Sequence, residues 1–280
     1  MNEYQNHPVY FTVKYILFAA LLLPSFLFAE PPLPSARDFA TEMMNATFKW
    51  IDQSGSASTC FLMRREAPDT ALYLVTAAHS FDGIAGETAV IVLRKPNADG
   101  SYQRHEHTFP ICRGEKPLWV RNEKHDVAVL RIADPFPVPV AALPVSAIAD
   151  ADHLKASAVH LCSPLFVLCY PKSLEADGSG LPVARQGIFA SPPLLPLSTR
   201  PTFFADYKAC PGDSGAPVFI AGADNHPLIV GVVTEQQYYV DELKGMYEEH
   251  TIRTPLGFGI ILHAQYVRET LEAAAKQGEF

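Results

Sequence analysis

The chain has 280 residues, with 22 basic and 30 acidic side chains and a formal net charge of −8. This excess of negative charge argues against a nucleic-acid-binding protein, because such proteins hold phosphates with a basic face. Hydrophobic residues make up 48% of the chain and charged residues 19%, which excludes an acidic disordered chain and provides enough apolar surface for a core.

The first element in chain order is an apolar segment near the amino terminus. Residues 15–29 read YILFAALLLPSFLFA, preceded by Lys14 and followed by the polar segment EPPLPS. This block is shorter than the roughly 20 residues that a membrane-spanning helix needs, and Ala29 supplies a small residue for cleavage. We therefore interpret residues 1–29 as a signal peptide of an exported protein, periplasmic or secreted. The alternative is an uncleaved signal anchor, and no other membrane contact is expected.

The remaining chain is predicted to consist mainly of short strands. Residues 30–45 form a lead-in, in which ARDFATEMMNA predicts a short helix. Apolar runs separated by Pro, Gly, Asn and Asp follow, without a helical period between them, and favour a closed barrel or sandwich over a parallel α/β sheet. The predicted strands span residues 71–77, 88–94, 126–132, 157–162, 183–190, 202–207, 216–221, 228–234 and 257–262.

A proline-rich link divides these strands into two halves. ADPFPVPVAALP, residues 133–144, interrupts the strand pattern, and we place the two halves at residues 46–138 and 139–262. Residues 263–280 hold the only convincing longer helix and a tail; four apolar residues of this helix share one face, namely Val267, Leu271, Ala274 and Ala275. The acidic segment DELKGMYEEH, residues 241–250, is predicted to be an exposed loop inserted in the second half, with a substrate-binding flap as the alternative.

Neither the cysteines nor the histidines form a metal-binding pattern. The chain has five cysteines, an odd number that leaves at least one thiol unpaired in a monomer. They form no C-x-x-C pair and fit no zinc spacing, so we interpret them as buried thiols with one or two disulfides of unassigned pairing. His105 and its neighbours Glu106 and His107 are interpreted as a solvated strand edge, since adjacent strand positions face opposite sides. No metal and no cofactor are expected. The cysteines are Cys60, Cys112, Cys162, Cys169 and Cys210.

The most specific motif is CPGDSGAPVF, residues 210–219, in which Ser214 lies between two glycines. A glycine at position 212 permits a backbone conformation closed to other residues and lets a carbonyl group approach. The amides of Gly212 and Ser214 are then free to point at one spot beside the serine oxygen, as an oxyanion hole. Losing one such donor typically costs about 3 to 4 kcal/mol of transition-state stabilisation.

A serine hydroxyl needs an imidazole to take its proton and a carboxylate to orient that imidazole. The apolar run LVTAAH ends in His79, which places this ring at a strand end. Asp126 stands directly before the apolar run VAVL, where a carboxylate is costly to bury unless it is hydrogen-bonded. The imidazole of His79 would donate the hydrogen bond that the Asp126 carboxylate needs.

TAAH, DVAVL and GDSGAP, in this order, resemble the chymotrypsin-like (trypsin-like) serine peptidases, and the bacterial, disulfide-poor branch in particular. The resemblance covers roughly residues 47–270 and includes LCYP, GVVT and GFGIIL. It implies an all-β fold of two six-stranded antiparallel β-barrels with the site in the cleft between them, followed by a C-terminal α-helix. It also implies that His79 is the general base, Asp126 its orienting partner and Ser214 the nucleophile, with Gly212 and Ser214 as oxyanion donors.

The sequence departs from this family at several positions. No cysteine lies beyond Ser214 to pair with Cys210, and Ser80 replaces the cysteine that follows the histidine in many members, which leaves Cys60 without its usual partner. There is also no Ile-Val-Gly-Gly-like start whose amine would pair with Asp213. Loop amides are expected to satisfy this carboxylate, as in the bacterial branch.

Family matching also suggests a substrate pocket. It places Lys208 near the pocket base, where a lysine indicates either a preference for acidic side chains or no ionic selection. It places Thr234, Glu235 and Gln236 on the strand that lines the pocket. Glu235 would neutralise Lys208, and Gln236 would narrow the entrance. We favour an outward-pointing or ion-paired lysine over a recognition residue, and assign no preferred cleavage residue.

The sequence therefore predicts an exported serine endopeptidase that acts on protein or peptide substrates through an acyl-enzyme. Two alternatives remain open. One is a non-catalytic binding protein on the same fold. The other is an α/β-hydrolase esterase that uses Ser214 with Asp241 and either His250 or His263, although its nucleophile elbow requires Gly-x-Ser-x-Gly where this chain has GDSGA.

Overall fold

The computed structural model describes residues 38–66, 71–82, 84, 86–114, 116–192, 194–222, 225–244 and 249–277. The predicted signal peptide, residues 1–29, lies outside the described residues. Within those ranges, no helix combines the length and the apolar character that a membrane crossing requires.

The amino-terminal half is an antiparallel sheet with the strand order β5-β4-β1-β2-β3-β9-β8, to which β10 adds in parallel beside β2. With eight strands it has two more than the six expected. The bounds are β1 Thr47–Ile51, β2 Ala57–Arg64, β3 Leu72–Thr76, β4 Thr88–Pro96, β5 Tyr102–Pro110, β8 Trp119–Arg121, β9 Ala128–Ile132 and β10 Leu143–Pro144. A separate short pair is formed by β6 Cys112–Arg113 and β7 Lys116–Pro117.

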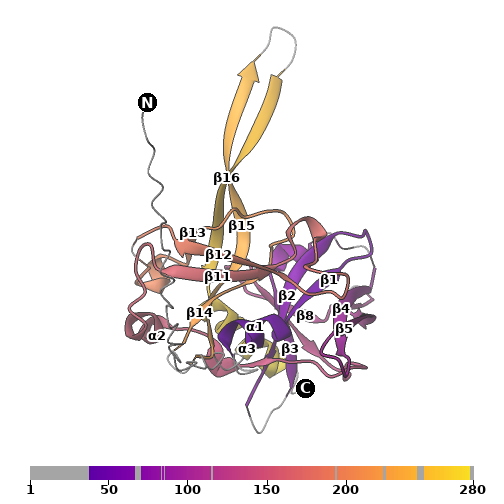
Figure 1. Ribbon diagram of the computed structural model, residues 1–280. Helices are drawn as coiled ribbons and strands as arrows, with labels where there is room; N and C mark the ends of the chain where they lie inside the picture. Colours follow the sequence, from indigo (N-terminus) through magenta and orange to yellow (C-terminus); the bar gives the residue numbers. More distant parts are fainter. Residues whose placement is uncertain are drawn as a thin grey trace, which may run out of the picture. The chain divides into compact units, whose positions relative to one another are not determined.

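The carboxy-terminal half is a closed barrel of antiparallel strands in the order β11-β12-β13-β16-β15-β14 (Figure 1). The expected all-β, chymotrypsin-like fold with a six-stranded barrel and a terminal helix is therefore confirmed. The bounds are β11 Pro164–Cys169, β12 Val183–Phe189, β13 Thr202–Asp206, β14 Pro217–Ala221, β15 Pro227–Lys244 and β16 Glu249–His263.

Three α-helices and four short 3-10 helices complete the described chain. The α-helices are α1 Phe39–Ala46, α2 Ala151–Ala156 and α3 Gln265–Gln277. The 3-10 helices are η1 Ala78–Phe81, η2 Val145–Ala147, η3 Pro171–Ser173 and η4 Leu197–Thr199. The predicted helix in the lead-in is confirmed, and the side chain of Asp38 caps it by accepting from two backbone amides. The predicted apolar face of α3 is buried in full.

Two predictions about local structure are wrong. Residues 157–162 are not a strand, because α2 precedes them and Ala158 and Cys162 have φ angles of 50° and 68°, which a strand does not accommodate. Residues 241–250 are not an inserted loop, since their described part belongs to β15 and β16.

Beyond the barrel, β15 and β16 continue as a two-stranded ribbon (Figure 1). Its pairing runs from Tyr238 opposite Pro255 to Lys244 opposite Glu249. Large apolar side chains are exposed along it, namely Tyr239, Val240, Ile252 and Leu256. Its sequence reads as a loop because charged residues such as Asp241 and Glu242 are mixed with these apolar ones without a regular alternation.

One cluster of buried side chains joins the two halves. It combines Val127 and Val129 from the amino-terminal sheet with Phe219 and Leu262 from the barrel, and Leu271 of α3 packs against both. This shared core fixes the junction of the two halves.

All five cysteines lie within the described residues, and none forms a disulfide. Cys60 and Cys169 are buried as expected, whereas Cys162 is exposed. The expectation of one or two disulfides is therefore not met, and the fold is held by its core and hydrogen bonds.

Candidate active site

Strand pairing brings His79 beside Asp126. The end of β3 lies opposite the start of β9, with Thr76 paired to Ala128. His79 follows β3 in the short helix η1, and Asp126 lies two residues before β9. Two positions 47 residues apart in the sequence thus lie close together, where β3 ends and the neighbouring β9 begins.

The side chains of Asp126, His79 and Ser214 form a continuous chain of hydrogen bonds. Oδ2 of Asp126 lies 2.6 Å from Nδ1 of His79, and Oδ1 accepts from the His79 backbone amide at 2.8 Å. When Nδ1 carries the proton that Asp126 accepts, Nε2 is left as an acceptor. Ser214 Oγ lies 2.9 Å from Nε2, in position to donate to it.

The carboxylate sets the protonation of this imidazole. The hydrogen bond to Asp126 raises the pKa of His79 above its ordinary value, although burial opposes the change. Burial alone would raise the pKa of Asp126, but the hydrogen bond and charge of His79 outweigh it and hold that pKa below its usual range. Asp126 therefore stays ionised at neutral pH and keeps the imidazole in one tautomer.

The turn around Ser214 accepts only glycine at two positions. Gly212 has φ +95°, and a Cβ there would lie 2.4 Å from the carbonyl oxygen of Tyr170. Gly215 has φ +82°, and a Cβ there would lie 2.2 Å from the carbonyl oxygen of Thr59. Both glycines are thus required by backbone conformation and by the close approach of neighbouring chain.

Two carbonyl groups of this turn accept hydrogen bonds from neighbouring backbone amides. Pro211 O accepts from Lys172 N at 2.6 Å, and Asp213 O accepts from Ala216 N at 2.8 Å. In a trans peptide the N–H points opposite to the C=O, so the amides of Gly212 and Ser214 point away from these partners. Among the described residues, neither amide donates a hydrogen bond. Both amides are therefore without an acceptor in the described structure, at the two positions that the sequence predicts as oxyanion donors.

Thr59 of β2 links the turn around Ser214 to the amino-terminal sheet by two hydrogen bonds. Its amide donates to Ser214 O at 3.0 Å, and its hydroxyl donates to Gly212 O at 2.9 Å. Thr59 cannot be recognised from the sequence, because a threonine in an apolar run carries no signal of a contact more than 150 residues away.

Asp213 is fully buried and has a charged partner as well as a loop amide. Its Oδ2 accepts from Cys210 N at 2.9 Å, as expected, and from Arg185 Nη1 of β12 at 3.2 Å. Burial raises the pKa of this carboxyl, and the guanidinium opposes the rise. Arg185 is a second residue that sequence analysis misses, since nothing in the local sequence relates it to the serine motif.

A pocket of about 400 Å³ opens beside Ser214 and His79. Thr234, Glu235 and Gln236 line it, as predicted. Lys208 does not line it: this residue is exposed and forms no ion pair with Glu235, which fits the outward-pointing interpretation.

Two residues of the ribbon, Tyr238 and Arg253, also line the pocket. Neither residue is predicted from the sequence, because the segment between them reads as a loop. The pocket rim thus carries one acidic side chain, Glu235, and one basic side chain, Arg253.

The histidines of the esterase alternative lie elsewhere. His263 is buried against the ring of Phe203, at 4.9 Å between centroids, and its ring nitrogens have no hydrogen-bond partner among the described residues. His250 is part of β16, in the ribbon. The histidine that contacts Ser214 Oγ is His79.

Comparison with known proteins identifies the family. A family model described as Trypsin matches residues 68–251, which is more than half of the chain. Among solved structures, the inactive form of a serine-to-alanine mutant of Rv3671c from M. tuberculosis H37Rv is 16% identical, with a TM-score of 0.46 and coverage of 88% of this chain and 95% of that chain. No curated protein matches the chain. By the extent of the family match, the chain belongs to the trypsin family.

Proposed function

We propose that the protein is a serine endopeptidase that hydrolyses peptide bonds in protein or peptide substrates through an acyl-enzyme, without a cofactor. The observation that carries the proposal is the hydrogen-bonded chain from Asp126 through His79 to Ser214 beside an open pocket. Membership of the trypsin family supports the same reaction class.

In the proposed reaction, His79 Nε2 takes the proton of the Ser214 hydroxyl as Oγ attacks the carbonyl carbon of the scissile peptide bond. The amides of Gly212 and Ser214 stabilise the resulting oxyanion. The imidazolium then gives its proton to the leaving amine, which departs and leaves an ester on Ser214. A water molecule, deprotonated by His79, hydrolyses this ester and regenerates the hydroxyl.

We also propose that the enzyme is exported and acts in the periplasm or outside the cell. The support is the apolar segment at residues 15–29, whose length and flanks are those of a signal peptide. Amino-terminal sequencing of the protein recovered from its native host tests this proposal. A mature chain that begins near residue 30 is the expected result, and retention of residues 1–29 in a cytoplasmic fraction would contradict it.

Labelling with a fluorophosphonate, combined with casein hydrolysis, tests the catalytic proposal. The wild-type protein should be labelled and should cleave casein, whereas Ser214→Ala and His79→Ala should do neither. Labelling that persists in His79→Ala would favour the esterase alternative. A folded wild-type protein that is not labelled would contradict the enzyme proposal and favour a binding protein.

A further inference from the structure

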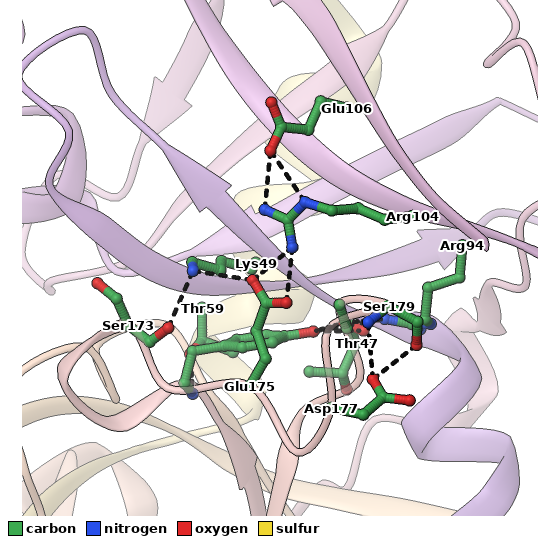
Figure 2. Close-up of polar contacts among 12 residues, drawn as sticks. Thr47, Lys49, Thr59, Arg94, Arg104, Glu106, Ser173, Glu175, Asp177 and Ser179 are labelled. Carbon is green, nitrogen blue, oxygen red and sulfur yellow. Dashed lines mark hydrogen bonds and ion pairs between the residues drawn. The ribbon is translucent and has the colours of Figure 1, made fainter. Parts of the chain in front are cut away.

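A group of charged side chains joins the amino-terminal sheet to the segment 170–182, which connects β11 to β12 (Figure 2). Its centre is the carboxylate of Glu175. Lys49 of β1 and Arg104 of β5 both point at this carboxylate, and a second carboxylate, Glu106, contacts Arg104 from the other side (Figure 2).

The carboxylate of Glu175 is largely buried and forms ion pairs with both Lys49 and Arg104. Arg104 Nη1 lies 2.7 Å and 2.6 Å from its two oxygens, and Lys49 Nζ lies 3.0 Å from one of them. The side chains of Lys49 and Glu175 are only 9% and 12% exposed, so solvent screens their attraction little. Burial would raise the pKa of Glu175, but the hydrogen bonds from Arg104 and Lys49 outweigh it and lower this pKa.

The same lysine also fixes the backbone of the segment. Lys49 Nζ donates to the carbonyl oxygen of Ser173 at 2.9 Å (Figure 2). Lys172 and Ser173 have φ angles of 49° and 66°, a left-handed conformation that residues with a side chain seldom adopt. Two successive residues in this region need external contacts to hold them, and the Lys49–Glu175 pair supplies such contacts.

The segment in turn determines the orientation of the peptide bond between Pro211 and Gly212. Lys172 N donates to Pro211 O at 2.6 Å. Because this peptide is planar and trans, the same bond directs the amide of Gly212 the opposite way. The carbonyl of Tyr170 packs against Gly212 on this side, where a Cβ would approach to 2.4 Å.

We propose that Glu175, acting with Lys49, is a positioning residue that orients the Gly212 amide as an oxyanion donor. The inference rests on the proposed peptidase function. Glu175 touches no reacting atom: its effect passes through Lys49, the left-handed segment and the Lys172 amide to the peptide of Gly212. Loss of the carboxylate removes the charged partner that holds the Lys49 ammonium beside the carbonyl oxygen of Ser173. The left-handed segment is then held less firmly, and so is the Lys172 amide that fixes the direction of the Pro211–Gly212 peptide.

The chain offers a matched control for this idea. Glu106 is also a carboxylate partner of Arg104, at 2.8 Å, but its side chain is 54% exposed and it contacts neither Lys49 nor the segment 170–182 in the described structure. Glu106→Gln therefore removes one charge from Arg104 and leaves the path to Gly212 intact. Glu175→Gln removes the charge at the start of that path.

The test compares kcat, KM and the rate of fluorophosphonate labelling for wild type, Glu175→Gln, Lys49→Met and Glu106→Gln, with active sites counted by titration and melting measured in parallel. We expect kcat and the labelling rate of Glu175→Gln and Lys49→Met to fall about 10-fold or more, towards the roughly 100- to 1,000-fold that complete loss of an oxyanion donor costs. KM should change less than about twofold, because an oxyanion donor acts mainly in the transition state, and Thr234, Glu235 and Gln236 line the pocket from a different strand. Glu106→Gln should behave as wild type.

Several results would overturn the inference. If wild type is active and Glu175→Gln has the same kcat, the inference is overturned. It is also overturned if Glu175→Gln and Glu106→Gln lose kcat to the same extent. If Glu175→Gln does not fold, Lys49→Met decides, and an unchanged kcat there overturns the idea. A folded wild type without any labelling would overturn the proposed function and this inference with it, so the two failures are distinguishable.

Discussion

The protonation of His79 depends on three carboxylates, those of Asp126, Asp82 and Glu235. Asp126 raises its pKa most, through the hydrogen bond, and the charges of Asp82 and Glu235 add to the effect while burial opposes it. As the proposed general base, His79 would act only in its neutral form. Activity should therefore increase with pH as this histidine loses its proton, at a pH above the ordinary value for histidine.

Replacement of Glu235 tests this charge effect. Glu235→Gln removes a negative charge that stabilises the imidazolium, so the acidic limb of the kcat/KM profile should move to lower pH. The shift should shrink at high salt because the His79 side chain is 42% exposed. Profiles measured at low and high ionic strength check this prediction. A shift to higher pH would contradict it, and Glu106→Gln, on the far β5 strand, serves as the control.

His263 is a titratable group that the proposed reaction does not use. It is 1% exposed, and burial lowers its pKa from 6.5 to about 4. The unfolded chain then binds a proton at a higher pH than the native state does. Stability should fall as the pH drops from about 6.5 to about 4, by a total of about 3 kcal/mol at 1.36 kcal/mol per pKa unit.

A leucine at this position should remove the acid sensitivity. In urea unfolding at pH 7 and pH 4.5, wild type should lose about 2 to 3 kcal/mol more than His263→Leu does. The variant should be at least as stable as wild type at pH 7, since it buries no unpartnered ring nitrogens. An equal loss in both proteins would contradict the prediction. His160→Gln, at an exposed position, is the control.

At the level of elements, sequence patterns predict those strands whose burial is continuous. LYLVT and PVFIA lie within runs that are apolar on both faces, and both form strands almost as predicted. The edge strand β5 is missed because most residues of its sequence, YQRHEHTFP, are polar. From the sequence alone the segment therefore looks solvent-exposed. The predicted strand at 157–162 is wrong because its apolar residues follow a capped helix and lie in turns.

The candidate site divides in the same way. His79, Asp126 and Ser214 are predictable because each lies in a local motif whose chemistry requires that residue type. Thr59 and Arg185 are not, because their importance comes from contacts between distant strands. The ribbon residues that line the pocket are missed for a related reason: the length and course of β15 and β16 depend on their mutual pairing.

The ribbon should contribute to substrate binding and little to stability. Replacement of residues 240–253 by Asn-Gly closes it with a short turn after Tyr239, which pairs with Thr254. None of the removed residues whose side chains are described is buried, so the free energy of unfolding should change by less than about 1 kcal/mol. KM for protein substrates should increase several-fold, because Arg253 and exposed apolar surface are lost beside the pocket.

Labelling of Ser214 by a small fluorophosphonate should be unaffected by this deletion, since the hydrogen bonds of His79 do not involve the ribbon. Arg253→Ala separates the pocket contribution from that of the rest of the ribbon. An unchanged KM for casein in the deletion variant would show that the ribbon does not contact substrate.

At the scale of the whole molecule, the candidate site depends on contact between two halves. His79 and Asp126 come from the amino-terminal sheet and Ser214 from the barrel turn, and the distance of 2.9 Å between His79 and Ser214 spans the junction. Helix α3 packs against β8 and β9 of the sheet and against β15 and β16 of the barrel. Its side chains belong to the cluster that both halves share, so the core that stabilises the fold also sets the distance between His79 and Ser214.

Leu271 tests this coupling, because it is 1% exposed and lies in the shared cluster. Leu271→Ala should lower the free energy of unfolding by about 2 to 5 kcal/mol through lost burial and the cavity left behind. Because the cluster contains residues of both halves, activity and far-UV circular dichroism should be lost in one coincident transition with urea. Glu272→Ala, on the exposed face of the same helix, should change stability by less than about 0.5 kcal/mol. Loss of activity at a much lower urea concentration than loss of the β-sheet signal would mean that the halves separate while each stays folded. In that case the shared core is not what holds His79 and Ser214 together.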